Sequence, residues 1–304
     1  MSFTSDVKDE LSRVQGTCPT CDKAALAAIL RVLGTLTITS GTRRLEVATE
    51  SPSVARALIS LLAASFALDK ELTVRRSTLH KTHNYLITIP DQPAFDDALR
   101  EMGIIGDGGI GEVPPPSLTE RSCCAGAYLR GAFLSAGYIA DPRGDFHFEI
   151  AAQTEPLAAA IASLMERGGI RARWCRRHAG YIVYLKGADQ IISFLAFAGA
   201  HQGALAMESA RVVKSLKNDT NRRVNAELAN QAKASEAACR QIERIRLLVE
   251  TRGASVLPPS LAEVARLRVA NPSASIAELG QLADPPLTKS AVYHRLRRID
   301  ALLD

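Results

Sequence analysis

The sequence lacks long uninterrupted apolar runs, and its 304 residues include only six cysteines. No stretch approaches the roughly 18 consecutive apolar residues that a membrane-spanning helix requires, so we expect no membrane contact. The first residues, MSFTSDVKDELSR, alternate acidic with basic side chains and lack the apolar centre of a secretory signal. Together these absences predict a cytoplasmic protein.

The cysteines are too sparse and too unevenly spaced for a disulfide framework, which predicts reduced thiols. Cys18 and Cys21 have the spacing of half a zinc site or of a redox pair. No second CxxC or HxxxH motif lies nearby in the sequence to complete such a site. We therefore expect no metal and no cofactor, and the role of this cysteine pair stays open.

The positive charge is concentrated in one segment. Residues 211–252 contain ten Lys/Arg and five Asp/Glu. The net charge of this segment is therefore +5, which equals the net charge of the whole chain. Residues 204–252 contain neither proline nor glycine, so we expect a basic helical connector over residues 206–253. Clustered cations favour a polyanionic partner, because their binding releases counterions from phosphates. The candidate phosphate contacts are Lys214, Lys217, Arg222 and Arg223. The alternative is a solvated helical linker that contacts a neighbouring domain.

The part of the chain before this connector repeats one order of elements. Two helices rich in small residues, 22–34 and 123–137, are each followed by strand-like segments, a second helix and a tyrosine-led strand. The strands alternate with period two and the helices with period 3.6, which predicts α+β halves with helices covering one face of each sheet. Because residues 103–116 are rich in glycine and proline, we expect a linker there and place the halves at residues 1–113 and 114–205.

Residues 254–304 carry the signals of three short helices. Ser260 with Glu263, and Ser275 with Glu278, have capping-box spacing, which predicts helices over residues 261–270 and from 276 to about 283. Thr288 is the expected cap of a last helix over residues 289–302.

The last helix has one apolar and one basic face. Val292, Leu296 and Ile299 recur at helical spacing and are expected to point inward. The side chains left outward are Lys289, Ser290, Tyr293, His294, Arg297 and Arg298. Such a face suits a helix-turn-helix recognition helix that reads base edges and contacts phosphates. A three-helix protein-docking module with a solvated basic face is the alternative.

Four blocks of the sequence carry a resemblance to a known family. They are TSDVKDELSR, RGAFLSAGYIADP at residues 130–142, KSLKNDTNRRVNAELAN at residues 214–230, and the segment 257–299 that begins LPPSLAEVARLRVANP. In this order and spacing, the chain resembles the WhiA family over almost its whole length.

The resemblance implies a fold and a role. The implied fold is a pseudo-two-fold LAGLIDADG-like scaffold of αββαββα repeats, followed by an all-α helix-turn-helix similar to the fourth region of sigma factors. The implied role is sequence-specific control of transcription in sporulation, or in cell division and chromosome segregation. The expected partner is double-stranded promoter DNA, in association with the nucleoid. Recruitment of a second transcription factor or RNA polymerase through the LAGLIDADG-like part stays an open alternative.

The LAGLIDADG motif of nucleases carries a metal-binding acid just before its final glycine. The matching segments here are LAAILRVLG at residues 26–34 and LRGAFLSAG at residues 129–137, which place Leu33 and Ala136 at the acid positions. Neither side chain can bind a hard cation, so we expect no catalytic residues and no nuclease activity. A metal-dependent endonuclease with rearranged acids, for which Asp141 is the nearest candidate, is the competing hypothesis.

Overall fold

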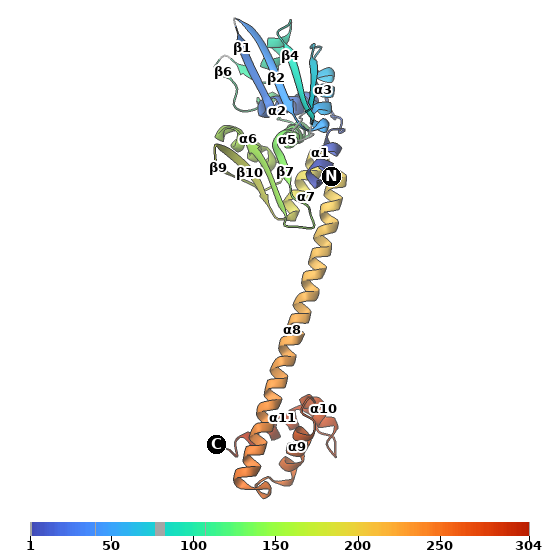
Figure 1. Cartoon of the computed structure of the whole chain (residues 1–304), viewed down its shortest axis with the longest axis vertical. Helices are drawn as coiled ribbons and strands as arrows, with labels where there is room; N and C mark the ends of the chain where they lie inside the picture. Colours follow the sequence, from blue (N-terminus) through green and yellow to red (C-terminus); the bar gives the residue numbers. More distant parts are fainter. Residues whose placement is uncertain (1, 40, 77–82, 107, 304) are drawn as a thin grey trace. The chain divides into compact units, whose positions relative to one another are not determined.

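The computed structural model describes residues 2–39, 41–76, 83–106 and 108–303 (Figure 1). The chain forms two compact units, residues 1–214 and 215–304, and each has its own hydrophobic core. None of the helices among the described residues combines the length and the apolar character needed to cross a membrane.

The first unit consists of two halves with the same order of elements. After α1 (Phe3–Leu11), the first half comprises α2 (Pro19–Leu33), β1 (Gly34–Thr39), β2 (Thr42–Thr49), α3 (Pro52–Ser65), β3 (Glu71–Arg76), β4 (His83–Pro90) and α4 (Phe95–Glu101). The second half comprises α5 (Ser122–Ala136), β7 (Gly137–Ile139), β8 (His147–Ala152), α6 (Glu155–Arg167), β9 (Ala172–Arg177), β10 (Gly180–Lys186) and α7 (Ala188–Ala198). Each half therefore has the order αββαββα that the resemblance implied.

The two halves also share one sheet topology. The strand orders are β1-β2-β4-β3 and β7-β8-β10-β9, and all neighbouring strands are antiparallel. Within β8, Phe148, Ile150 and Ala152 are buried and alternate with more exposed residues. This period of two gives each sheet one face for the core, and the predicted α+β pseudo-repeat is confirmed.

The motif helices α2 and α5 pack closely against each other between the two sheets (Figure 1). A Cβ atom on Gly131 would lie only 2.2 Å from the carbonyl oxygen of Ala25 and 2.9 Å from the Cβ of Ala28. No residue larger than glycine fits at this crossing, because the two backbones nearly touch. The small residues of the motif thus permit the close packing of the two helices.

The glycine- and proline-rich segment between the halves is tied to α2. It contains the short hairpin β5 (Ile105–Gly106) and β6 (Gly109–Ile110), followed by the 3-10 turn η1 (Pro116–Leu118). The guanidinium of Arg31 donates hydrogen bonds to the carbonyls of Gly103 at 2.7 Å and Gly111 at 3.3 Å. This linker is consequently docked, although it contains no long helix and no strand of the main sheets.

The basic connector lies within one helix, α8 (His201–Arg252). Near its start, Ala204 and Met207 are buried in the core of the first unit. Near its end, Ile245 and Leu248 are buried in the core of the second unit. Gly253, which has φ of +77°, follows the last helical residue, as expected for a residue that tolerates the left-handed region.

The second unit adds three short helices to α8. They are α9 (Pro259–Ala270), α10 (Ile276–Gln281) and α11 (Lys289–Asp300), preceded by the 3-10 turn η2 (Ala254–Val256). Their buried apolar residues, including Leu261, Leu279 and Leu296, form one core with Leu248. The predicted capping box at Ser275 and Glu278 is present, with both of its hydrogen bonds.

The predicted capping box at Ser260 and Glu263 is wrong. Helix α9 begins two residues earlier than predicted, at Pro259, and its cap, Pro258, makes no side-chain hydrogen bond. Proline suits the first position of a helix, because its φ is fixed at a helical value and its missing N–H would have no partner there. Glu263 instead accepts a hydrogen bond from the backbone N–H of Asp284 at 3.0 Å.

Candidate nucleic-acid interface

Helix α11 separates a buried apolar stripe from an exposed basic face. The hydroxyl of Thr288 accepts a hydrogen bond from the N–H of Ala291 at 3.2 Å and caps the helix, as predicted. Val292, Leu296 and Ile299 are at most 3% exposed. The predicted inward stripe is therefore correct, although the helix ends two residues earlier than expected, at Asp300.

The outward residues of α11 all lie on the exposed face of the helix. They are Lys289, Ser290, Tyr293, His294, Arg297 and Arg298. The rings of Tyr293 and His294 lie 5.7 Å apart in an edge-on arrangement. The face thus offers cations, two hydroxyl groups and two aromatic rings, which can contact phosphates and the edges of bases.

The turn before α11 depends on a glycine in α10. The N–H of Leu287 donates to the carbonyl of Gly280 at 2.8 Å. A Cβ atom on residue 280 would lie 2.3 Å from the carbonyl oxygen of Leu287. This close approach sets the short connection that presents the first turn of α11.

Two ion pairs hold α11 against the neighbouring helices α8 and α9. The guanidinium of Arg244 on α8 contacts a carboxylate oxygen of Asp300 at 2.9 Å, and it donates to the Asp300 carbonyl at 2.9 Å. Arg295 lies 3.8 Å from Glu263 of α9. Since Glu263 also binds the backbone of the turn at Asp284, one carboxylate links α9, the turn and α11.

A buried arginine holds the loop between α9 and α10, and it was not among the residues predicted from the sequence. Arg268 is 2% exposed and donates to the carbonyl of Ala274 at 2.6 Å. Burial lowers the pKa of this guanidinium below its ordinary value. Arg268 follows Leu261 and Val264 at seven and four residues, so the helical spacing already placed it on the inward face.

Hydrogen bonding perturbs one carboxyl of this unit. The backbone N–H of Ser275 donates to Glu278 at 2.7 Å and holds the pKa of that carboxyl below its usual value. The hydrogen bonds of the α10 cap therefore favour the ionised form of the Glu278 carboxyl.

The four candidate residues of the connector differ in their surroundings. Lys217 and Arg223 are exposed on α8. Arg222 is also exposed and forms an ion pair with Asp219. Lys214 is only half-exposed, because its ammonium group donates to the carbonyl of Gly144 and lies 4.5 Å from the centre of the Phe146 ring. Lys214 is thus less available to a phosphate than the other three.

The ends of α2 and α5 carry no acids. Leu33 and Ala136 are the last residues of these helices. Asp141 is exposed and paired with Arg143 at 2.7 Å, and the Arg143 guanidinium lowers the pKa of Asp141 to about 2. Within the described ranges, one group of three or more potential metal ligands occurs, and it consists of cysteines at the opposite, N-terminal ends of these helices.

That cysteine group was missed because its members are far apart in the sequence. It joins Cys18 and Cys21 to Cys123 and Cys124. The repeat contains a signal for it: Leu26 matches Leu129 and Gly34 matches Gly137, and the same offset places Cys21 on Cys124.

The fold and the exposed face of α11 define a class of protein, a duplicated LAGLIDADG-like scaffold joined to a helix-turn-helix domain. Three family models match the chain: the WhiA N-terminal LAGLIDADG-like domain over residues 19–105, the WhiA LAGLIDADG-like domain over residues 125–217, and the WhiA C-terminal HTH domain over residues 220–303. The chain belongs to the WhiA family, and the resemblance seen in the sequence is confirmed.

Individual relatives agree with this assignment. The "Probable cell division protein WhiA" of Heliobacterium modesticaldum is 43% identical over all of this chain and 96% of its own length. The protein of the same name from Alkaliphilus metalliredigens is 37% identical over all of this chain and 98% of its own length. The crystal structure of full-length DUF199/WhiA from Thermatoga maritima is similar at a TM-score of 0.62 and 25% identity, over 99% of this chain and 98% of that one.

Proposed function

We propose that the chain is a sequence-specific DNA-binding regulator of transcription whose main DNA contacts come from α11. The observation that carries this proposal is the shared exposed face of Lys289, Ser290, Tyr293, His294, Arg297 and Arg298, opposite a fully buried apolar stripe. Thr288 caps the helix and Gly280 permits the short turn before it, so the first turn of α11 is free to enter a major groove. Lys217, Arg222 and Arg223 are proposed as additional phosphate contacts, with a smaller part for Lys214.

The process that we propose is cell division, with chromosome segregation or sporulation as related settings. Relatives that match this chain over its full length are named probable cell division proteins. Promoter DNA is the proposed partner, which implies association with the nucleoid in the cytoplasm. The exposed basic face supports this partner, because a phosphate backbone binds best to clustered cations.

We further propose that the protein does not cleave DNA. Hydrolysis of a phosphodiester by two metal ions needs oxygen ligands at the scissile group. Leu33 and Ala136 supply none, and Asp141 is paired with Arg143. The LAGLIDADG-like unit is proposed to act as a scaffold, which leaves room for a second transcription factor or RNA polymerase to dock there.

A salt titration tests the proposal. Full-length protein is titrated with promoter fragments at several salt concentrations and compared with the variant Arg297→Ala. Loss of one phosphate contact should weaken binding several-fold and reduce the slope of log K against log salt by about 1. The matched control is Arg56→Ala, which removes the same charge from an exposed position on α3 of the first unit.

Two outcomes would contradict the proposal. Equal binding and equal salt slopes for the wild type and Arg297→Ala would remove α11 from the interface and favour a docking protein. Nicked plasmid in a parallel reaction with magnesium or manganese would establish the competing endonuclease.

A further inference from the structure

Four cysteines converge where the two motif helices begin. Cys18 is the N-cap of α2 and Cys21 lies in its first turn, while Cys123 and Cys124 lie in the first turn of α5. Their four sulfur atoms all lie within 4.8 Å of one another. Cys18 and Cys21 have the spacing of half a zinc site, and the fold supplies the other half from the second repeat.

The distances between the sulfur atoms match one tetrahedral ion. The Sγ atom of Cys18 lies 3.4 Å from that of Cys21 and 3.6 Å from that of Cys124. Cys124 in turn lies 3.9 Å from Cys21 and 3.9 Å from Cys123. A zinc–sulfur bond of about 2.3 Å places the corners of a tetrahedron about 3.8 Å apart. Ligation therefore requires only small movements of these side chains.

Other cysteine chemistries fit this geometry less well. A disulfide requires two sulfur atoms about 2 Å apart and would use the cysteines in pairs, whereas all four are free thiols here. A cluster of several irons places bridging sulfides between its thiolates, so it needs a wider set of ligands. One ion bound by four sulfurs is the arrangement that these distances favour, and sulfur ligands in a tetrahedron select zinc among abundant divalent metals.

The surroundings suit an anionic centre. Four thiolates around a divalent ion carry a net charge of −2, and the N–H groups in the first turns of α2 and α5 favour negative charge there. The hydroxyl of Thr17 lies 3.6 Å from the Cys21 sulfur and can donate to it.

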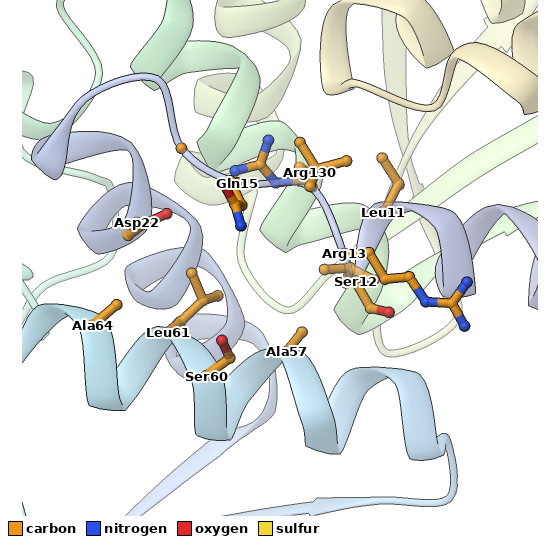
Figure 2. Close-up of a pocket in the computed structure, with 13 residues that line it drawn as sticks. Leu11, Ser12, Arg13, Gln15, Asp22, Ala57, Ser60, Leu61, Ala64 and Arg130 are labelled. Carbon is orange, nitrogen blue, oxygen red and sulfur yellow. The ribbon is translucent and has the colours of Figure 1, made fainter.

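Arg130 supplies a buried positive charge nearby. It is 7% exposed, it interacts electrostatically with Cys21 and Asp22, and its Nη2 atom has no hydrogen-bond partner among the described residues. Figure 2 shows Arg130 and Asp22 among the side chains that line the adjoining pocket. A buried guanidinium with an unused donor is stabilised by a negatively charged neighbour, which the metal thiolate centre provides.

We propose that Cys18, Cys21, Cys123 and Cys124 bind a single zinc ion that clamps α2 to α5. The four thiols release their protons to solvent on binding, and no electron transfer is involved. Because α2 belongs to the first half and α5 to the second, the ion joins the two repeats of the LAGLIDADG-like unit. The role of this site is structural, and it is independent of DNA binding by α11.

The test uses full-length protein, stripped of metal and fully reduced. Cobalt is titrated first, because four thiolates around cobalt give intense sulfur-to-metal absorption that reports the ligand set. Zinc is then added in competition with a chromophoric chelator. We expect one equivalent of each metal, displacement of cobalt by zinc, and a higher Tm of the first unit in the zinc-bound protein.

Matched variants assign the ligands. Cys123→Ser changes an exposed residue and should fold, as checked by circular dichroism, but bind zinc at least about 100-fold more weakly. Cys175→Ser and Cys239→Ser remove exposed cysteines outside the group and should bind as the wild type does.

Three results would overturn the proposal. They are no cobalt or zinc binding by the reduced wild type, unchanged zinc affinity in Cys123→Ser, and isolation of the protein with the absorption spectrum of a multi-iron cluster.

Discussion

Single residues in the second unit belong either to the exposed face of α11 or to the framework behind it. Arg297 and Arg298 are exposed, and their charged groups face solvent. Arg268 is buried, and its guanidinium donates a hydrogen bond to a backbone carbonyl of the loop between α9 and α10. Removal of an exposed arginine should therefore affect DNA binding, whereas removal of the buried arginine should affect the free energy of unfolding.

Replacing the buried arginine should destabilise the second unit. In Arg268→Met, the carbonyl of Ala274 loses its charged donor while most of the side-chain volume is kept. We expect a loss of about 2–3 kcal/mol in the free energy of unfolding, measured by urea denaturation followed by circular dichroism. Arg266→Ala, an exposed arginine on the same helix, is the control and should be close to neutral. An equal loss in both variants would show that burial of Arg268 is unimportant.

A second prediction at the level of one residue concerns the glycine that permits the turn before α11. Gly280→Ala would place a methyl group 2.3 Å from the Leu287 carbonyl oxygen, so the turn must shift. We expect a cost of about 1–3 kcal/mol and a corresponding loss of DNA affinity. Gly106→Ala, whose new methyl group would meet no atom within 4 Å, should change neither quantity.

Among the elements, α10 depends most visibly on its cap, because it has only six residues. The Ser275 hydroxyl accepts from the N–H of Glu278, and the Glu278 carboxylate accepts from the N–H of Ser275. Ser275→Ala should reduce the free energy of unfolding by about 1 kcal/mol.

The same cap predicts a pH dependence. Because the folded pKa of Glu278 is lowered, its contribution to stability is fully present above its unfolded pKa and is lost as pH falls through the lower folded pKa. The difference in Tm between the wild type and Glu278→Ala should therefore shrink at acidic pH. A difference that stays constant from pH 7 to below pH 4 would show that the carboxylate makes no charge-dependent contribution.

At the scale of the whole molecule, the two units should respond separately to core substitutions. Leu248 is fully buried in the second core, while its neighbour Leu247 on the same helix is 50% exposed. Leu248→Ala should destabilise the second unit by about 2–5 kcal/mol through the lost apolar contacts and the cavity that remains. Leu247→Ala makes the same change of residue type at an exposed position of the same helix, so it is the control and should have little effect on the free energy of unfolding.

Calorimetry of the full chain measures this difference. We expect Leu248→Ala to lower the transition of the second unit while the transition of the first unit stays in place. A single transition that moves as one in this variant would show that α8, which contributes to both cores, couples their unfolding.

Much of the fold follows from local patterns. The small-residue helices, the period-two strands and the tyrosine-led strands predicted two α+β halves, because periodicity reports which face of an element is buried. The full order αββαββα was implied by the resemblance to the WhiA family. The outward face of α11 was predicted for the same reason, from the spacing of Val292, Leu296 and Ile299. The glycine after Arg252 and the cap at Thr288 marked helix ends through properties of single residues.

Contacts between distant segments needed the tertiary structure. Ser260 and Glu263 have capping-box spacing, but Pro259 starts the helix and Glu263 binds the turn at Asp284, 21 residues away. The sequence predicted Lys214 as a phosphate contact, yet its ammonium group donates to the Gly144 carbonyl and lies over the Phe146 ring. Local spacing cannot report such partners, because chain folding alone decides which segments meet.

The sequence by itself determined the repeated α+β scaffold, the absence of acids at the motif positions and the amphipathic character of the last helix, since each depends on residues a few positions apart. Only the tertiary structure decided that Cys21 meets Cys124 across 103 residues and that Arg130 lies buried beside them. The physical reason is that the close crossing of α2 and α5 at Ala25 and Gly131 aligns the two helices and brings their first turns together.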